Sequence, residues 1–272
     1  MRGGDIIKRL KFNYDLTATY SEEISNHSFS ALCIPQDTQR QKISELNIST
    51  DKGAVCQITN DSFLNKKLYG KIKTPHTSFG IHISGIADTG IDIFEEYTDY
   101  PFGAILYKAQ TELTRPGESL TRYHKHFVFE KSDGVYNTAL KIMRDIPNVF
   151  SYNSGSTRIH ETSESAFTLG KGVCQDYAHI MLSLLRMEHI PARYVVGMML
   201  GEGSSHAWVE ALCNGYWYGF DPTNNKLVND EYIRMSCGRD SSDCPVIKGS
   251  FYGSGVQNQS ETVLVEEINV KD

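Results

Sequence analysis

The sequence predicts an α+β protein with a β-rich N-terminal region, and three observations carry this prediction. Before about residue 115, apolar and polar residues alternate with the period of a strand in several runs. Those runs follow one another without helical segments between them, which favours an antiparallel sheet or sandwich. Helical spacing appears only afterwards. We therefore expect a β-rich domain over residues 1–115 and a second domain over residues 116–272.

The strand signals of the first region are regular. In "LKFNYDLT", Leu10, Phe12, Tyr14 and Leu16 alternate with polar residues, which is the pattern of a half-buried strand. The runs "SFSALCIP", "AVCQIT" and "SFGIHISG" repeat the pattern. Turn-type segments such as "STDKG" and "ADTG" separate them.

The second region mixes helices and strands. The stretch "SDGVYNTALKIMRDIP" has helical spacing and is expected to stop before Pro147, and residues 151–165 are expected to form a loop. A helix is expected from Cys174 to near His189, because apolar residues recur at helical spacing on one side of it. Strands are expected in "RYVVGMML", "SHAWVEAL", "GYWYGFDPTNN", "VIKGSFYGSG" and "ETVLVEEI".

Composition excludes several classes of protein. The chain has 272 residues, 40% of them hydrophobic, and a formal net charge of -6, which gives no support for nucleic-acid or membrane-surface binding. No apolar run approaches the roughly 18 to 20 residues of a membrane span, and the first residues lack the apolar core of a signal peptide. We expect a cytoplasmic protein. The oligomeric state stays open.

Metal ligation has weak support in the sequence. None of the six cysteines forms a C-x-x-C pair. His124 and His126 alternate as a metal pair would, but no third ligand can be named. We therefore expect no metal and no organic cofactor.

Cys174 stands where a thiol is activated. It follows the glycines at 170 and 172 and begins a helix, whose unpaired N–H groups and dipole favour the thiolate. His206 opens a predicted strand beside the flexible "GEGSS", and Asp221 ends the next strand before a proline turn. A nucleophile, a base and a group that orients the base are the parts of a catalytic triad. Each residue alone is more often structural.

Four segments taken together change that balance: "GVCQDYAHIMLSLLR", "IPARYVVG", "HAWVEA" and "FDPTNN". In this order they resemble the transglutaminase-like superfamily, in its bacterial branch of cysteine proteases. The opening "FNYDLTATYSEEISNHSFSALCIPQDTQRQ" and the later "YIRMSCGRDSSDCPVIKGSFYG" extend the resemblance over most of the chain. It implies a papain-like core in residues 116–272, with Cys174 as nucleophile, His206 as base and Asp221 as orienting acid.

The sequence departs from the family pattern at three places. His189 replaces the usual glycine before "IPAR", where we expect a left-handed residue after the helix. "DCPV" has one proline where two are common. No tryptophan precedes Cys174 to steady the oxyanion, so beside the N–H of Cys174 we predict Tyr152 as the second donor.

The resemblance implies acyl transfer through a thioester but leaves the substrate open. A peptidase or amidase acting on peptide or carboxamide bonds is our first prediction. Transglutaminase-type transfer to an amine is the second, since fold does not choose between them. A catalytically silent binding module is a third alternative of another class.

Overall fold

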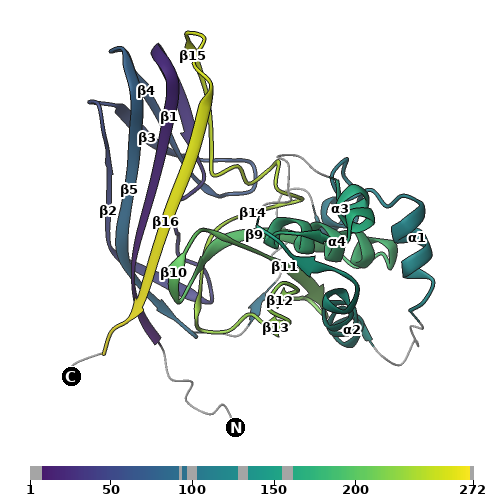
Figure 1. Ribbon diagram of the computed structural model, residues 1–272. Coiled ribbons are helices and arrows are strands. Elements are labelled where there is room, and N and C mark those ends of the chain that lie inside the picture. The colour runs from purple at the N-terminus through teal and green to yellow at the C-terminus, as the bar shows by residue number, and fades with distance from the viewer. Residues whose placement is uncertain (1–7, 92–93, 97–102, 128–133, 155–161, 270–272) are drawn as a thin grey trace.

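The computed structural model describes residues 8–91, 94–96, 103–127, 134–154 and 162–269. Within these ranges the chain forms a large β-sheet, beside which lies a smaller sheet covered by helices (Figure 1). The α+β class and the strand-rich N-terminal region predicted from the sequence are confirmed. In the described part of the chain, no helix is long and apolar enough to cross a membrane.

The large sheet is built around one long curved strand. Within the described ranges it contains eight strands, β1 (Lys8–Ala31), β2 (Gln41–Thr50), β3 (Val55–Asn60), β4 (Lys66–Ile72), β5 (His76–Thr89), β10 (Gly201–Gly203), β15 (Ile247–Tyr252) and β16 (Gln257–Glu267). The first half of β1 lies between β5 and β16, and its second half lies between β4 and β15. The alternation predicted for "LKFNYDLT" is confirmed, because its apolar side chains are buried and form part of the core.

The C-terminal strands return to this sheet. β16 pairs antiparallel with β1 from Leu10↔Glu267 to Tyr20↔Gln257, and β15 pairs with the later part of β1. The sequence had assigned these residues to the second domain, but strand pairing between distant segments leaves no local signal. Residues 247–267 therefore belong to the large sheet, while a domain boundary at residue 115 stays a prediction.

The smaller sheet and its helices form the other part of the molecule. The described strands are β6 (Phe94–Glu96), β9 (Ala192–Met199), β11 (His206–Cys213), β12 (Tyr216–Asp221), β13 (Lys226–Leu227) and β14 (Tyr232–Gly238), in the order β13-β12-β11-β9-β14 with β6 beside β12. A separate parallel pair joins β7 (Ser151–Tyr152) to β8 (Lys171–Gly172). The described helices are η1 (Ala104–Tyr107), α1 (Glu118–His124), α2 (Gly134–Val149), α3 (Ser163–Leu169) and α4 (Cys174–Met187).

α4 is the central helix of this part of the molecule. It packs against β9 and β11 on one side and against α2 and α3 on another. The sequence predicted one buried stripe, but every residue from Asp176 to Arg186 is buried. The additional burial comes from the flanking helices, which cover the side that a two-layer arrangement would leave exposed.

Two helix boundaries differ from expectation. α2 continues through Pro147 to Val149, because a proline in the last turn removes only its own N–H bond, and the N–H of Phe150 still bonds the carbonyl of Ile146 at 3.0 Å. The predicted start of this helix, residues 132–133, lies outside the described residues. α3 begins at Ser163 inside the predicted loop, since Thr162 caps it by accepting from the N–H of Ser165. Residues 155–161 of that loop also lie outside the described ranges.

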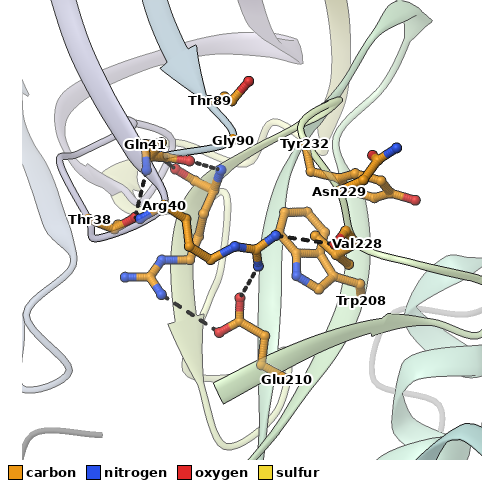
Figure 2. Close-up of a pocket in the computed structure, with 11 residues that line it drawn as sticks. Thr38, Arg40, Gln41, Thr89, Gly90, Trp208, Glu210, Val228, Asn229 and Tyr232 are labelled. Atoms are coloured by element: carbon orange, nitrogen blue, oxygen red, sulfur yellow. Dashed lines mark hydrogen bonds and ion pairs between the residues drawn. The ribbon is translucent and has the colours of Figure 1, made fainter. Parts of the chain in front are cut away.

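A buried ionic cluster joins the two sheets. Arg40, between β1 and β2, forms an ion pair with Glu210 on β11 (Figure 2), and their closest charged atoms are 3.5 Å apart. Glu210 also accepts from the Nε of Arg193 at 2.7 Å, and Arg193 donates to Glu95 at 2.7 Å. Beside the cluster is a cavity of about 20 Å³, which has room for about one water molecule. These contacts fix the large sheet against the strand that begins with His206.

Candidate active site

Cys174 is the first residue of α4, and its position depends on how that helix begins. The carboxylate of Asp176 accepts a hydrogen bond from the N–H of Val173 at 2.8 Å, which closes the first turn. A Cβ on Gly172 would lie 2.2 Å from Oδ2 of Asp176, so only glycine fits between β8 and this turn. The thiol is therefore held at the positive end of a buried helix.

His206 is the first residue of β11, and its partner is on the neighbouring strand. The Nε2 atom of His206 lies 2.8 Å from Oδ2 of Asp221, the last residue of β12. Because Nε2 is occupied in this way, Nδ1 is the ring nitrogen left to face the Cys174 thiol, which is near enough to help raise the pKa of His206. The structure thus brings the three predicted residues into one chain of contacts, Cys174 to His206 to Asp221.

Asp221 has two sets of hydrogen-bond partners. Its Oδ1 accepts from the N–H groups of Thr223 and Asn224 at 3.0 and 3.1 Å, which closes the turn after β12. Its Oδ2 accepts from the hydroxyl of Tyr232 and from the amide of Asn224, both at 2.7 Å, as well as meeting His206. The carboxylate is fully buried, so its orientation is fixed from both sides.

These contacts shift the pKa values of the pair. Burial opposes the charged imidazole, but the hydrogen bond and charge of Asp221 and the contact with Cys174 raise the pKa of His206 to about 9. Burial would raise the pKa of Asp221, but the hydrogen bonds from His206, Tyr232 and Asn224 lower it. An imidazolium and a carboxylate are therefore the favoured charge states at neutral pH.

Cys174 and His206 line an open cleft of about 820 Å³, while Asp221 is buried and bonded to His206. The walls of the cleft come from the start of α4, from β9 and β11, from the segment 241–248 and from residues 257–261 of β16. The cleft therefore lies between the smaller sheet and the large sheet. A reacting group could reach the thiol from solvent through it.

Residues 125–222 match the family model described as the transglutaminase-like superfamily, and this segment contains Cys174, His206 and Asp221. The chain contains a transglutaminase-like core. Its geometry agrees with the papain-like arrangement that the resemblance implied, with a thiol at the start of a buried helix and its two partners on adjacent strands.

Relatives extend the comparison beyond the transglutaminase-like core. An uncharacterized protein of Mycobacterium tuberculosis is 26% identical over 92% of this chain and 88% of its own length. An uncharacterized protein of Mycobacterium leprae is 36% identical over 43% of this chain, and this match spans 45% of that protein, less than half of it. The crystal structure of a "putative cysteine protease" from Cytophaga hutchinsonii superposes with a TM-score of 0.81 at 21% identity, covering 98% of this chain and 93% of that one. The whole fold, including the large sheet, is therefore shared with that protein.

Tyr152, the predicted second oxyanion donor, lies on β7 opposite Gly172 of β8. Its side chain is 59% exposed, and partial burial and the nearby Cys174 raise its pKa. The tyrosine is thus close to the thiol, while its role as a donor stays a prediction. His189 has a φ of +57°, which confirms the expected left-handed residue after α4.

Two further histidines have structural partners. His179 is buried and accepts from the N–H of Ser241 at 3.2 Å, which joins α4 to the segment that lines the cleft. His124 contacts Glu188 at 2.6 Å through Nε2. Among the residues that the structure describes, no three His, Cys, Asp or Glu side chains are grouped as a metal site would require.

Sequence reasoning missed three residues that support the site. Asn224 lies in the quoted "DPTNN", and an amide three residues after an aspartate is a signal that could have been used. Asp176 is at the third position of α4, where a side chain that accepts from the N–H before the helix is a known signal of a helix start. Tyr232 begins a strand that the sequence did not predict, and nothing local to it indicates a contact with Asp221.

Proposed function

We propose that this protein is a cysteine acyl-transfer enzyme that hydrolyses peptide or carboxamide bonds. The observation that carries the proposal is the imidazole of His206, which is bonded to the buried carboxylate of Asp221 and lines the same cleft as the Cys174 thiol, close enough for Cys174 to raise its pKa. If His206 and Asp221 had only structural roles, no partly exposed thiol would be needed beside them. Cys174 is partly exposed and lines the cleft.

The chemistry follows from these positions. The thiolate of Cys174 attacks the carbonyl carbon, a C–S bond forms, and the carbonyl electron pair moves to the oxygen. The N–H of Cys174 at the helix start and the hydroxyl of Tyr152 are the proposed donors to that oxyanion. His206 then gives its proton to the leaving nitrogen as the C–N bond breaks, which leaves a thioester and a free amine.

The thioester is hydrolysed by the same residues, with His206 now acting as a base instead of an acid. Neutral His206 takes a proton from water, the hydroxide oxygen adds to the thioester carbon, and the C–S bond breaks to give a carboxylic acid and the thiolate. The buried negative charge of Asp221 stabilises the imidazolium each time it forms. The pKa of about 9 for His206 supports this assignment, because the proton is available at neutral pH.

Thiol labelling tests the proposal without knowledge of the substrate. Iodoacetamide should alkylate Cys174 much faster at pH 6–7 than the exposed Cys56, measured by mass spectrometry of the same digest. Burial raises the pKa of Cys33 and Cys213 to about 12, so these two serve as slow internal references. His206→Ala should reduce the labelling of Cys174 alone. Equal labelling of Cys174 and Cys56, with no effect of the His206 variant, would favour a silent binding module.

A panel of peptides and carboxamides then separates the two enzyme classes. With water as acceptor, mass spectrometry finds free acid; with an added primary amine, a transferase incorporates that amine into the product. We expect free acid to predominate even in millimolar amine, because the cleft is open to solvent. Predominant incorporation of the amine would assign transglutaminase-type transfer instead.

A further inference from the structure

β16 has an open edge beside the proposed catalytic residues. On one side β16 pairs with β1 along its length, but on the other side β10 pairs only with Val263, Leu264 and Val265. No other strand among the described residues continues this side over residues 257–261. A strand edge without a neighbour leaves main-chain N–H and C=O groups available to a further strand.

The hydrogen bonds to β1 identify which main-chain groups lie at this edge. The N–H of Ile268 bonds the carbonyl of Arg9 at 2.9 Å, and the N–H of Ser21 bonds the carbonyl of Val256 at 3.1 Å. In an antiparallel pair, residues that bond the neighbouring strand alternate with residues that point away from it. The even-numbered residues of β16 therefore bond β1.

The odd-numbered residues direct their N–H and C=O groups away from β1. Val263 and Val265 direct theirs toward β10. Gln257, Gln259 and Glu261 come next in the same series, and their groups point to the open side. These three residues thus present a regular row of donors and acceptors to whatever occupies that side.

This open edge lines the same cleft as the proposed nucleophile. The cleft walls include Cys174, His206 and residues 257–261. Ser205, next to His206, donates its N–H at 3.2 Å and its hydroxyl at 2.7 Å to the carboxylate of Glu261. The edge therefore begins directly beside His206, the proposed base, and continues away from it along the wall.

The side chains along the edge are polar where the cleft runs. Val263 and Val265 are buried on one face of β16, whereas Gln257 and Gln259 occupy the same face and are exposed. Apart from Cys174 and His206 themselves, the charged residues of the cleft lining are Lys248 and Glu261, which have opposite signs. The apolar residues of the cleft, such as Val196, Val246 and Ile247, lie on its other walls, so recognition along this edge falls to the main chain.

We propose that an extended segment of a substrate polypeptide adds to β16 as a further strand over residues 257–261. This inference rests on the proposed function, because the added strand brings its carbonyl to Cys174. At about 3.3 Å per residue the edge spans roughly 13 Å, which suits four to five residues. The substrate class is therefore an unfolded or locally extended polypeptide of varied sequence, bound as sheet-edge domains bind peptides.

The test compares reagents that differ in length and in main-chain donors. Peptides of one to six randomised residues carry either a C-terminal chloromethyl ketone or an N-terminal chloroacetyl group, so that both chain directions are covered. Each rate of Cys174 alkylation is divided by the iodoacetamide rate of the same protein. We expect this ratio to rise at least tenfold between one and five residues, and to fall about 5- to 10-fold when alternate peptide nitrogens are methylated.

Gln259→Pro removes one N–H from the open edge and fills its place with the proline ring, whereas Gln259→Ala keeps the N–H and removes the side chain. For long peptides, the ratio of the peptide rate to the iodoacetamide rate should be about 5- to 10-fold lower in the proline variant than in the alanine variant. A ratio independent of length for both reagent types, or equal ratios in the two variants, would overturn the added strand. If the proline variant fails to fold, the methylated peptides on the wild-type protein decide. Failure of the iodoacetamide reaction to depend on His206 would instead overturn the proposed function.

Discussion

Asp221→Asn separates two roles that the structure gives to one carboxylate. The asparagine oxygen can keep the place of Oδ1, which accepts from the N–H groups of Thr223 and Asn224. Its amide nitrogen then takes the place of Oδ2. There it meets the hydroxyl of Tyr232 and the amide of Asn224, which are both donors, and it brings no negative charge to His206.

The expected loss of stability follows from the pKa of His206. In the folded protein this pKa is about 9, above the ordinary value of 6.5, so the pair stabilises the fold most below pH 6.5 and loses this contribution as the pH rises through about 9. At pH 7 the rise of the His206 pKa from 6.5 to about 9 adds about 2.5 kcal/mol to the free energy of unfolding. We expect the variant to lose most of that amount at pH 7 in addition to a pH-independent loss from the bonds of Tyr232 and Asn224, and only the latter loss at pH 10.

The expected loss of reactivity is larger than this loss of stability can explain. Alkylation of Cys174, or turnover of any substrate the wild type cleaves, should fall by about 10 to 10³ per folded molecule. The factor is smaller than the roughly 10⁴ of a serine protease, because a thiol and an imidazole already form an ion pair without a third member.

Urea denaturation and alkylation are measured side by side on the same preparations. Asn224→Ala is the matched control, because it removes one side-chain bond to Asp221 and keeps the charge. Should Asp221→Asn be less stable but react as fast as the wild type per folded molecule, the carboxylate would belong to the turn alone. His206 would then be oriented by another group.

Three further predictions concern the same site. Between pH 6 and 10, substrate turnover should fall as pH rises through about 9, because His206 loses the proton it gives to the leaving nitrogen; a pH–rate profile checks this, and an undiminished rate at pH 10 would contradict it. Tyr232→Phe removes a hydrogen bond that lowers the pKa of Asp221, so kcat should fall about 3- to 10-fold with an unchanged circular dichroism spectrum; equal kcat would exclude a positioning role for the hydroxyl. Gly172→Ala should lower stability by about 1–3 kcal/mol and slow Cys174 alkylation, because its Cβ would meet the carboxylate of Asp176; thermal melting and labelling measure both effects, and a wild-type Tm would show that the turn adapts.

The sequence was most informative where the physical cause is local. A thiol behind two glycines at the start of an apolar-periodic run indicates a helix N-terminus, and Cys174 is the first residue of α4. The left-handed conformation of His189 was predicted for the same reason, because it depends on the end of one helix. Both features are decided by a few consecutive residues.

Features that depend on distant segments could not be predicted in this way. Tyr232 contacts Asp221 although β14 and β12 are separated by β9 and β11 in the sheet order, and no spacing in the sequence encodes this approach. β15 and β16 had the alternation of strands, but the choice of β1 as their partner is made by the tertiary fold. The open edge of β16 was therefore also beyond the reach of the sequence.

The pairing of β1 with β16 also sets an order for biosynthesis. A ribosome makes β1 first, yet the partner that covers one side of its first half comes more than 200 residues later. At about 5–20 residues per second, that side of β1 waits for ten seconds or more, a time in which a chaperone or another unpaired strand can occupy it. Cys174, His206 and Asp221 all leave the ribosome before residues 257–261. A nascent chain can therefore hold the proposed nucleophile before it has the wall along which we expect a polypeptide to bind.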